Sequence, residues 1–246
     1  MSLIKKTFSS FKSLLPKKVK QYAREVLRIP TLEGSLQIMR RNGFAPSTVI
    51  DIGAYAGDWT RLCKRLFPNS YVLMVEPQKA RYFDLERVVT DYSGIVLSQS
   101  LLGATEQSSV GFYAMNSASS VLPETVKQQQ PTCYLSMTTL DKLTDATPFE
   151  KPDLIKLDVQ GFELEVLRGG MHTLTSTEAV IIETNLIAIY DGAPLFHEVV
   201  SFMAEYRFYV YDICTFFRRP YDNALWQVDL IFVNQSSELL ASKRWA

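Results

Sequence analysis

Cysteine and histidine are scarce in this chain of 246 residues, which holds three cysteines and two histidines. The cysteines lie far apart, at Cys63, Cys133 and Cys214, and none of them forms a C-x-x-C pair. This spacing excludes a disulfide framework or a zinc knot as the organising feature of the fold. Isolated thiols are typical of a reducing compartment, so we expect reduced cysteines and a cytoplasmic protein.

Long apolar runs are missing as well, although 47% of the residues are hydrophobic. No stretch reaches the roughly 18 apolar residues of a membrane-spanning helix, so the sequence predicts none. The first residues also lack the continuous apolar stretch of a secretory signal. The hydrophobic content is ample for a buried core, and no internal repeat divides it. We therefore expect one folded globular domain with small additions.

The formal net charge of zero hides an uneven distribution of charge. Residues 1–41 contain ten Lys and Arg against Glu25 and Glu33, so this segment carries +8 and the remainder carries −8. We predict a basic N-terminal helical arm over residues 1–46 and the main domain over residues 47–246. Apolar residues at spacings of one helical face alternate with lysines in the arm. Three interpretations stay open: packing on the main domain, packing on a second subunit of a homodimer, and peripheral contact with a membrane.

Short apolar runs alternate with helical patterns from residue 47 onward. The predicted strands are 48–52, 71–75, 95–97, 153–157, 179–182, 208–213 and 228–233, and the predicted helices are 58–66, 78–90, 162–174 and 195–206. Such alternation indicates an α/β protein with a mostly parallel, seven-stranded sheet. Residues 104–140 break the pattern and predict a small β insertion. The last two strands are joined without a helix, which predicts an antiparallel hairpin at the sheet edge.

A glycine turn follows the first predicted strand. The turn contains Asp51, Gly53 and Gly57 and opens a helix. Gly53 allows a sharp turn and Gly57 allows close approach of a ligand or a helix. Tyr55 occupies the middle position, so this is not the dinucleotide pattern G-x-G-x-x-G. A turn that binds no ligand is the alternative interpretation.

A second acidic residue, Glu76, stands where the second predicted strand ends, and Pro77 stops that strand. In doubly wound sheets, an acidic residue about 20 positions after the glycine turn binds ribose hydroxyls. The interval from Gly57 to Glu76 fits this rule. The two features together favour binding of a nucleoside over a solvated glutamate at a strand end.

The run from Leu154 to Gly170 resembles the signature of the FkbM-type methyltransferases, most of all in Lys156-Leu157-Asp158-Val159-Gln160-Gly161-Phe162-Glu163. Supporting matches are Asp51–Gly57, Glu76-Pro77, Leu102-Gly103, Ser119-Ser120, Thr139-Leu140-Asp141, Ile182-Glu183 and Asp229–Val233. The resemblance covers residues 48 to 234. It implies a Rossmann-like class I methyltransferase fold with S-adenosylmethionine (SAM) as cofactor and S-adenosylhomocysteine (SAH) as product. It also implies an O-methyltransferase acting on a hydroxyl of a sugar, glycan or natural-product small molecule.

The resemblance and the sheet geometry together assign a cofactor site at the carboxyl ends of the strands. Its predicted residues are Asp51, Gly53, Ala54, Tyr55, Gly57, Glu76, Pro77, Gln99, Ser100 and Asp158. Asp51 would receive the SAM ammonium group directly or through water. Many SAM enzymes place an Asp after the third strand for the adenine amino group. No carboxylate occurs in that stretch here, so Gln99 and Ser100 are the substitutes.

Three carboxylates are predicted to meet beside the transferred methyl group: Asp158, Glu163 and Glu183. We predict that Asp158 is the base or orients the acceptor hydroxyl, while the other two shape the site. Helix capping and solvation at strand ends are the alternatives. Three such groups would also accommodate a divalent cation. The sequence does not require one, so no metal ligand is assigned.

Two other functions remain as alternatives: a nucleotide-binding oxidoreductase and a non-catalytic SAM-binding protein. The oxidoreductase would need a tighter glycine pattern and a catalytic Tyr–Lys pair or Cys. A nucleic-acid substrate is not expected, because the main domain is acidic and contains no motif of base-modifying enzymes. The expected partner is a small-molecule or glycan acceptor.

Overall fold

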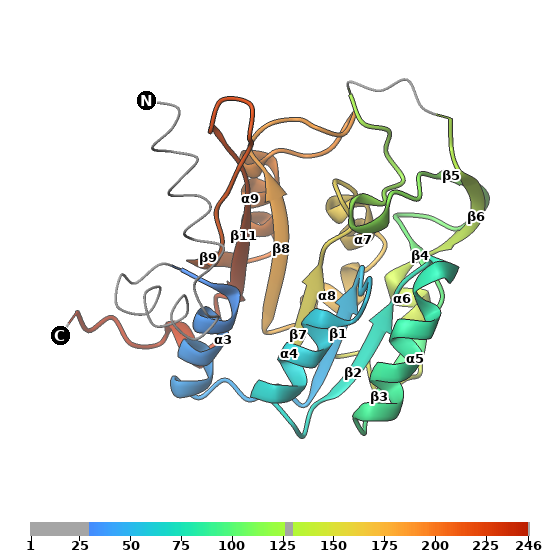
Figure 1. The fold of residues 1–246 in the computed structure, drawn as a ribbon. Coiled ribbons are helices and arrows are strands. Elements are labelled where there is room, and N and C mark those ends of the chain that lie inside the picture. Colours follow the sequence, from blue (N-terminus) through green and yellow to red (C-terminus); the bar gives the residue numbers. More distant parts are fainter. Residues whose placement is uncertain (1–29, 126–129, 246) are drawn as a thin grey trace, which may run out of the picture.

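The computed structural model describes residues 30–125 and 130–245 (Figure 1). Residues 1–29 of the predicted N-terminal arm lie outside the described residues. Element labels follow Figure 1 and begin with α3. None of the described helices is long and apolar enough to cross a membrane.

The centre of the molecule is an eight-stranded sheet with the order β10-β11-β8-β7-β1-β2-β3, in which β9 also pairs with β11. Its strands are β1 (Thr48–Ile52), β2 (Tyr71–Val75), β3 (Ile95–Ser98), β7 (Leu154–Leu157), β8 (Ala179–Asn185), β9 (Phe208–Ile213), β10 (Phe217–Arg218) and β11 (Leu225–Asn234). The five strands from β3 to β8 run parallel, and β11 runs antiparallel to both β8 and β9. The mostly parallel sheet and its antiparallel edge hairpin are confirmed, with the two-residue β10 as an addition.

Helices cover both faces of this sheet (Figure 1). They are α3 (Leu32–Arg41), α4 (Asp58–Leu66), α5 (Tyr82–Asp91), α6 (Leu140–Thr144), α7 (Glu163–Arg168), α8 (Met171–Thr175) and α9 (Phe196–Glu205), with short 3-10 turns η1 (Lys79–Arg81), η2 (Asn116–Ala118) and η3 (Glu238–Leu240). Val49 packs with α3, α4 and α5, whereas its neighbour Ile50 packs with α6 to α9 on the other face. The parallel strands are mostly apolar because helices bury both faces of the sheet.

The helix predicted over residues 162–174 is in fact two helices, α7 and α8, which separate at Gly169 and Gly170. A Cβ atom on Gly169 would lie 2.0 Å from the carbonyl oxygen of Gly103, and one on Gly170 would lie 2.6 Å from Leu140. The chain bends here because two neighbouring segments approach the backbone more closely than a side chain permits. Helical periodicity alone does not reveal such a contact.

The β insertion forms a small separate sheet of β4 (Leu101–Leu102), β6 (Cys133–Thr138) and β5 (Gln107–Phe112), in that order. Strands β5 and β6 lie within the predicted insertion, residues 104–140, and β4 precedes it. Leu101, Phe112 and Met137 make its core. This sheet stands over the carboxyl ends of β2 and β3, where it supplies one wall of a cavity.

Helix α3 belongs to the stretch that we assigned to the arm, yet it packs on the main domain. Leu36 and Met39 are fully buried in the core that α3 shares with α4. Ser35 donates a hydrogen bond of 2.6 Å from Oγ to Asp212 on β9. These contacts fix the start of α3 against the central sheet.

Candidate active site

Two cavities meet at the carboxyl ends of the parallel strands. The first encloses about 700 Å³, including open solvent at its mouth, between the ends of β1 and β2 and the β insertion. The second encloses about 730 Å³ by the same measure, beside β7, β8 and β11. Gly53, Tyr55 and Asp158 line both cavities. A ligand that spans the two cavities therefore passes these three residues.

The glycine turn after β1 is shaped by close contacts. Gly53 and Gly57 both have a φ of +79°, a conformation that favours glycine. A Cβ atom on Gly53 would lie 1.9 Å from the carbonyl oxygen of Asp158, and one on Gly57 would lie 2.7 Å from Val88 on α5. The first glycine thus permits contact between two loops, and the second permits packing of a helix. Ala54 is buried beneath the turn and lines the second cavity.

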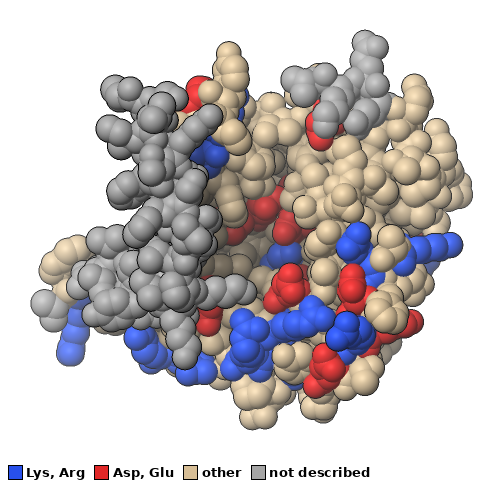
Figure 2. All heavy atoms as spheres, viewed as in Figure 1, with Lys and Arg blue, Asp and Glu red and all other residues tan. Residues whose placement is uncertain are grey.

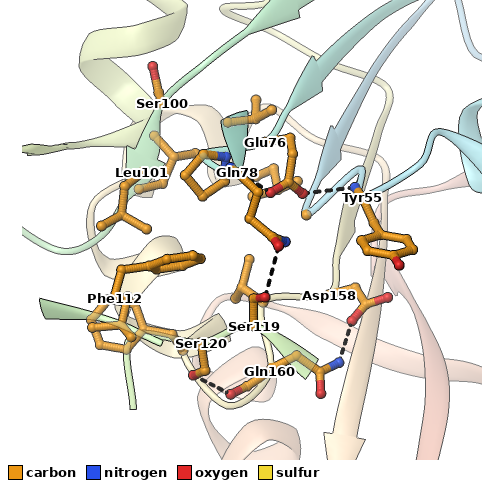
Figure 3. A pocket seen from close by; sticks show the side chains of 18 of the residues that line it. Tyr55, Glu76, Gln78, Ser100, Leu101, Phe112, Ser119, Ser120, Asp158 and Gln160 are labelled. Carbon is orange, nitrogen blue, oxygen red and sulfur yellow. Dashed lines mark hydrogen bonds between the residues drawn. The ribbon is translucent and has the colours of Figure 1, made fainter. Parts of the chain in front are cut away.

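Glu76 is held at the wall of the first cavity, with 2% of its surface exposed. Its Oε2 accepts a hydrogen bond of 2.8 Å from the backbone N–H of Tyr55, and its Oε1 accepts one of 2.9 Å from Gln78 (Figure 3). Burial raises the pKa of Glu76, and these two backbone donors oppose that rise. Pro77 follows in the same wall. The predicted carboxylate therefore lies in the cavity, fixed by the glycine turn.

The two residues proposed for adenine lie differently. Ser100 lines the first cavity and receives support from Ser98, with the two Oγ atoms 2.9 Å apart. Gln99 does not line that cavity, and lies in a separate polar groove beside Ser136. The apolar residues Leu101 and Phe112 line the first cavity in place of Gln99.

Lys156 connects the glycine turn with the loop after β7. Its Nζ lies 3.2 Å from the carbonyl oxygen of Gly53, 3.2 Å from Asp158 Oδ2 and 3.5 Å from Asp51 Oδ1. Burial acts to lower the pKa of Lys156, but the attraction of Asp158 and Asp51 outweighs it, so the pKa is raised. This lysine is therefore a buried cation between two carboxylates.

Asp51 is fully buried and lines neither cavity. Its Oδ2 accepts a hydrogen bond of 2.6 Å from Thr60 on α4. Burial raises the pKa of Asp51, although Lys156 and Thr60 lower it. The structure thus places Asp51 behind the glycine turn, where it acts on the cavities through Lys156.

Asp158 and Glu183 converge, as the sequence predicts, and a third carboxylate joins them. Asp229 on β11 is the register partner of Glu183 on β8, and all three carboxylates line the second cavity. Burial raises the pKa of Glu183 well above its usual value, and repulsion from Asp158 and Asp229 adds to the rise. In Figure 2, acidic side chains gather in a hollow near the middle of the face shown.

Glu163 lies beneath the site instead of in it. Its Oε1 accepts hydrogen bonds of 3.1 Å from the backbone N–H groups of both Val159 and Gly161, and it lines neither cavity. Burial raises the pKa of Glu163 to about 7 in spite of these donors. Its position is that of a brace for the loop from Asp158 to Gly161.

Sequence reasoning gave no role to Lys156, Gln160 or Asp229, which the structure brings into the same cluster. Lys156 and Asp229 could have been identified from the sequence as candidate site residues, because charged residues are rarely buried in apolar strands without a partner. Gln160 carries no such local signal. Among the described residues, no group of three or more His, Cys, Asp or Glu is arranged to hold a metal ion.

The order of the strands, the antiparallel β11 and the carboxylate after β2 together define the class I, Rossmann-like methyltransferase fold. The site lies where open α/β sheets bind their ligands. The chain belongs to the FkbM methyltransferase family, because the model of the methyltransferase FkbM domain matches residues 51–210.

A curated relative, Methyltransferase 1 of Beauveria bassiana strain ARSEF 2860, is 28% identical over 144 residues, which cover 50% of this chain and 58% of that protein. The precorrin-6y C5,15-methyltransferase of Geobacter metallireducens GS-15 has a TM-score of 0.49 and 11% identity over 83% of this chain and 88% of its own. The magnesium protoporphyrin IX methyltransferase of Synechocystis PCC 6803, solved with bound SAM, has a TM-score of 0.46 and 10% identity over 82% of this chain and 79% of its own. The fold assignment rests on the strand order and not on these two likenesses.

Proposed function

We propose that this chain transfers a methyl group from SAM to a hydroxyl group of a sugar, a glycan or a natural-product small molecule. Membership of the FkbM family supports the methyl transfer. The observation that carries the proposal is Asp158, a carboxylate with 34% of its side chain exposed, at the junction of the two cavities. A carboxylate in this place can accept the proton of a hydroxyl group.

The first cavity fits the adenosine part of SAM. Each oxygen of Glu76 accepts one backbone hydrogen bond, so each keeps acceptor capacity for one of the two ribose hydroxyls. Leu101, Phe112 and Val121 offer apolar walls for a purine ring. When bound, SAM supplies an electrophilic methyl group on its sulfonium.

The second cavity supports a small polyhydroxylated acceptor. Trp59 and Phe217 give it aromatic walls, while Glu183 and Asp229 provide acceptors for hydroxyl groups. Its carboxylates outnumber the single lysine, Lys156, and this excess of negative charge disfavours phosphate groups. The same charge supports a small-molecule partner over nucleic acid.

The chain's own residues divide the work at this junction. Lys156 holds the Asp158 carboxylate through an ion pair of 3.2 Å and so fixes the direction of its free lone pairs. Asp158 orients the acceptor hydroxyl and takes its proton, and alignment of the hydroxyl with the methyl group provides the rest of the rate enhancement. An oxidoreductase is disfavoured, because Tyr55 stands in the middle of the turn between Gly53 and Gly57, where the dinucleotide pattern G-x-G-x-x-G requires a glycine.

The experiment is a transfer assay with isotope-labelled SAM and a panel of acceptors that begins with sugars, followed by measurement of SAM binding by calorimetry. Asp158→Asn is expected to lose about 100-fold or more in turnover and to keep its affinity for SAM. Asp91→Asn, on the exposed end of α5, is the matched control and should behave as wild type. Full activity of Asp158→Asn would refute the role of Asp158, and absence of SAM binding by the wild type would refute the function. Repeating the assay in EDTA tests for a divalent cation.

A further inference from the structure

The side chain of Gln160 stands between the two converging carboxylates. Its Nε2 donates a hydrogen bond of 2.8 Å to Asp158 Oδ1 and one of 2.5 Å to Glu183 Oε1. A carboxamide nitrogen carries two N–H groups, so this pair of bonds uses both of them. Gln160 is therefore a neutral bridge that keeps two carboxyl groups at one fixed spacing, and Figure 3 shows its bond to Asp158.

Two further hydrogen bonds hold Gln160, one at its carboxamide oxygen and one at its backbone oxygen. The hydroxyl of Tyr190, which is buried, donates a hydrogen bond of 2.9 Å to Gln160 Oε1. Ser120 Oγ donates one of 2.8 Å to the backbone oxygen of Gln160. A flipped carboxamide would aim its oxygen at two carboxylates and its N–H groups away from them. The observed orientation is therefore the favourable one.

The backbone at this point is held in an unusual conformation. Gln160 has a φ of +56° and Gly161 has a φ of +96°. A left-handed conformation costs a residue other than glycine about 1 kcal/mol, so the surrounding contacts must hold Gln160 in place. The contacts that hold it are the hydrogen bonds to Asp158, Glu183, Tyr190 and Ser120.

We infer that Gln160 is a positioning residue that sets the spacing and the charge state of the Asp158–Glu183 pair. The backbone oxygen of Gln160 also accepts a hydrogen bond from Ser120, which lies in the segment after β5 and lines the first cavity. Gln160 thus links the carboxylate pair to a wall of the first cavity, through its side chain on one side and its backbone on the other. The inference rests on the proposed function for its catalytic meaning, but the linkage itself is a property of the protein without an acceptor.

The test follows the titration of Glu183 by NMR in full-length protein with SAH bound and side-chain carboxyl carbons labelled. The Glu183 signal is assigned by its loss in Glu183→Gln. Gln160→Gly deletes the carboxamide while it keeps the left-handed backbone, so the loop is expected to survive. An N–H donor favours the charged form of a carboxylate. Removing it should therefore move the Glu183 titration to higher pH by about one unit.

Two variants sharpen the result. Gln160→Glu replaces the donor with a carboxylate beside Asp158, Glu183 and Asp229, and should move the Glu183 titration further upward than Gln160→Gly does. Asn223→Gly, which also replaces an amide side chain in the left-handed conformation but on an exposed loop, is the matched control and should leave the titration unchanged.

The inference and the proposed function fail in different ways. A Glu183 titration in Gln160→Gly that equals the wild type, in protein with the wild-type melting temperature and SAH affinity, would overturn the inference. If a methylated acceptor is found, Gln160→Gly should lower kcat, because Gln160 aligns the Asp158 and Glu183 carboxylates. A shifted titration in a protein that methylates no acceptor would uphold the linkage and count against the proposed function alone.

Discussion

Replacement of Glu163 by glutamine tests, by measurements of protein stability alone, whether this buried residue has a raised pKa and braces the loop after β7. Both backbone donors, from Val159 and Gly161, bond to the same oxygen, Oε1. The oxygen of a glutamine can accept both bonds, so Glu163→Gln keeps the brace and removes only the ionisable group. The pKa of Glu163 is about 7 in the folded protein, against an ordinary value of 4.5.

The sign of the effect follows from proton binding. Between pH 4.5 and pH 7 the unfolded chain releases the Glu163 proton while the folded protein retains it, so the wild type loses stability as the pH rises. A shift from 4.5 to about 7 corresponds to about 3 kcal/mol once both states are ionised. Glu163→Gln avoids this loss. Its free energy of unfolding should exceed the wild-type value by about 3 kcal/mol near pH 8 and by less than about 1 kcal/mol at pH 5.

The assay is urea unfolding, followed by tryptophan fluorescence, of both proteins at pH 5 and pH 8. Glu165→Gln, on the same helix but half-exposed and paired with Arg168, is the control. A surface pair of this kind is worth about 0–1 kcal/mol, and the control difference should not grow between the two pH values. A stability difference between Glu163→Gln and wild type that is equal at both pH values would refute the conclusion that burial raises the pKa of Glu163.

Three further predictions concern the site. Glu76→Gln should weaken SAM binding about 10- to 100-fold by calorimetry, because one charged acceptor for a ribose hydroxyl is lost, whereas Glu86→Gln on the exposed face of α5 should bind as wild type does. Gly53→Ala should abolish SAM binding and lower the melting temperature by several degrees, since the new Cβ would lie 1.9 Å from a carbonyl oxygen. The control is Gly192→Ala, which has a similar φ of +75° and nothing within 4 Å of the new Cβ, and it should cost only about 1 kcal/mol of stability. Lys156→Met should lower the free energy of unfolding by about 3–5 kcal/mol at neutral pH, as it leaves two carboxylates without their buried cation, and an equal melting temperature for this variant and the wild type would contradict the ion-pair network.

The sequence by itself determined the sheet and the first cavity. Strand β1 and its glycine turn are local features, since an apolar run and a φ of +79° at Gly53 each depend on residues close in the chain. The position of Glu76 follows from the same logic, because parallel strands end at one edge and the interval from the turn is fixed by one helix and one strand. Gly53, Tyr55 and Glu76 could therefore be named in advance as residues that line this cavity, whereas Asp51, Ala54 and Gly57, which were named with them, do not line it.

Only the tertiary structure decided how the carboxylates divide their roles. Asp51 and Glu183 lie within strands and Glu163 opens a helix. Nothing in their spacing along the sequence distinguishes a cavity residue from a buried brace. The difference arises from long-range contacts: Lys156 reaches Asp51 on a neighbouring strand, and β11 returns antiparallel to bring Asp229 beside Glu183. Burial and Coulombic interaction depend on atoms that are distant in the chain, so charge state and role emerge only when the sheet is assembled.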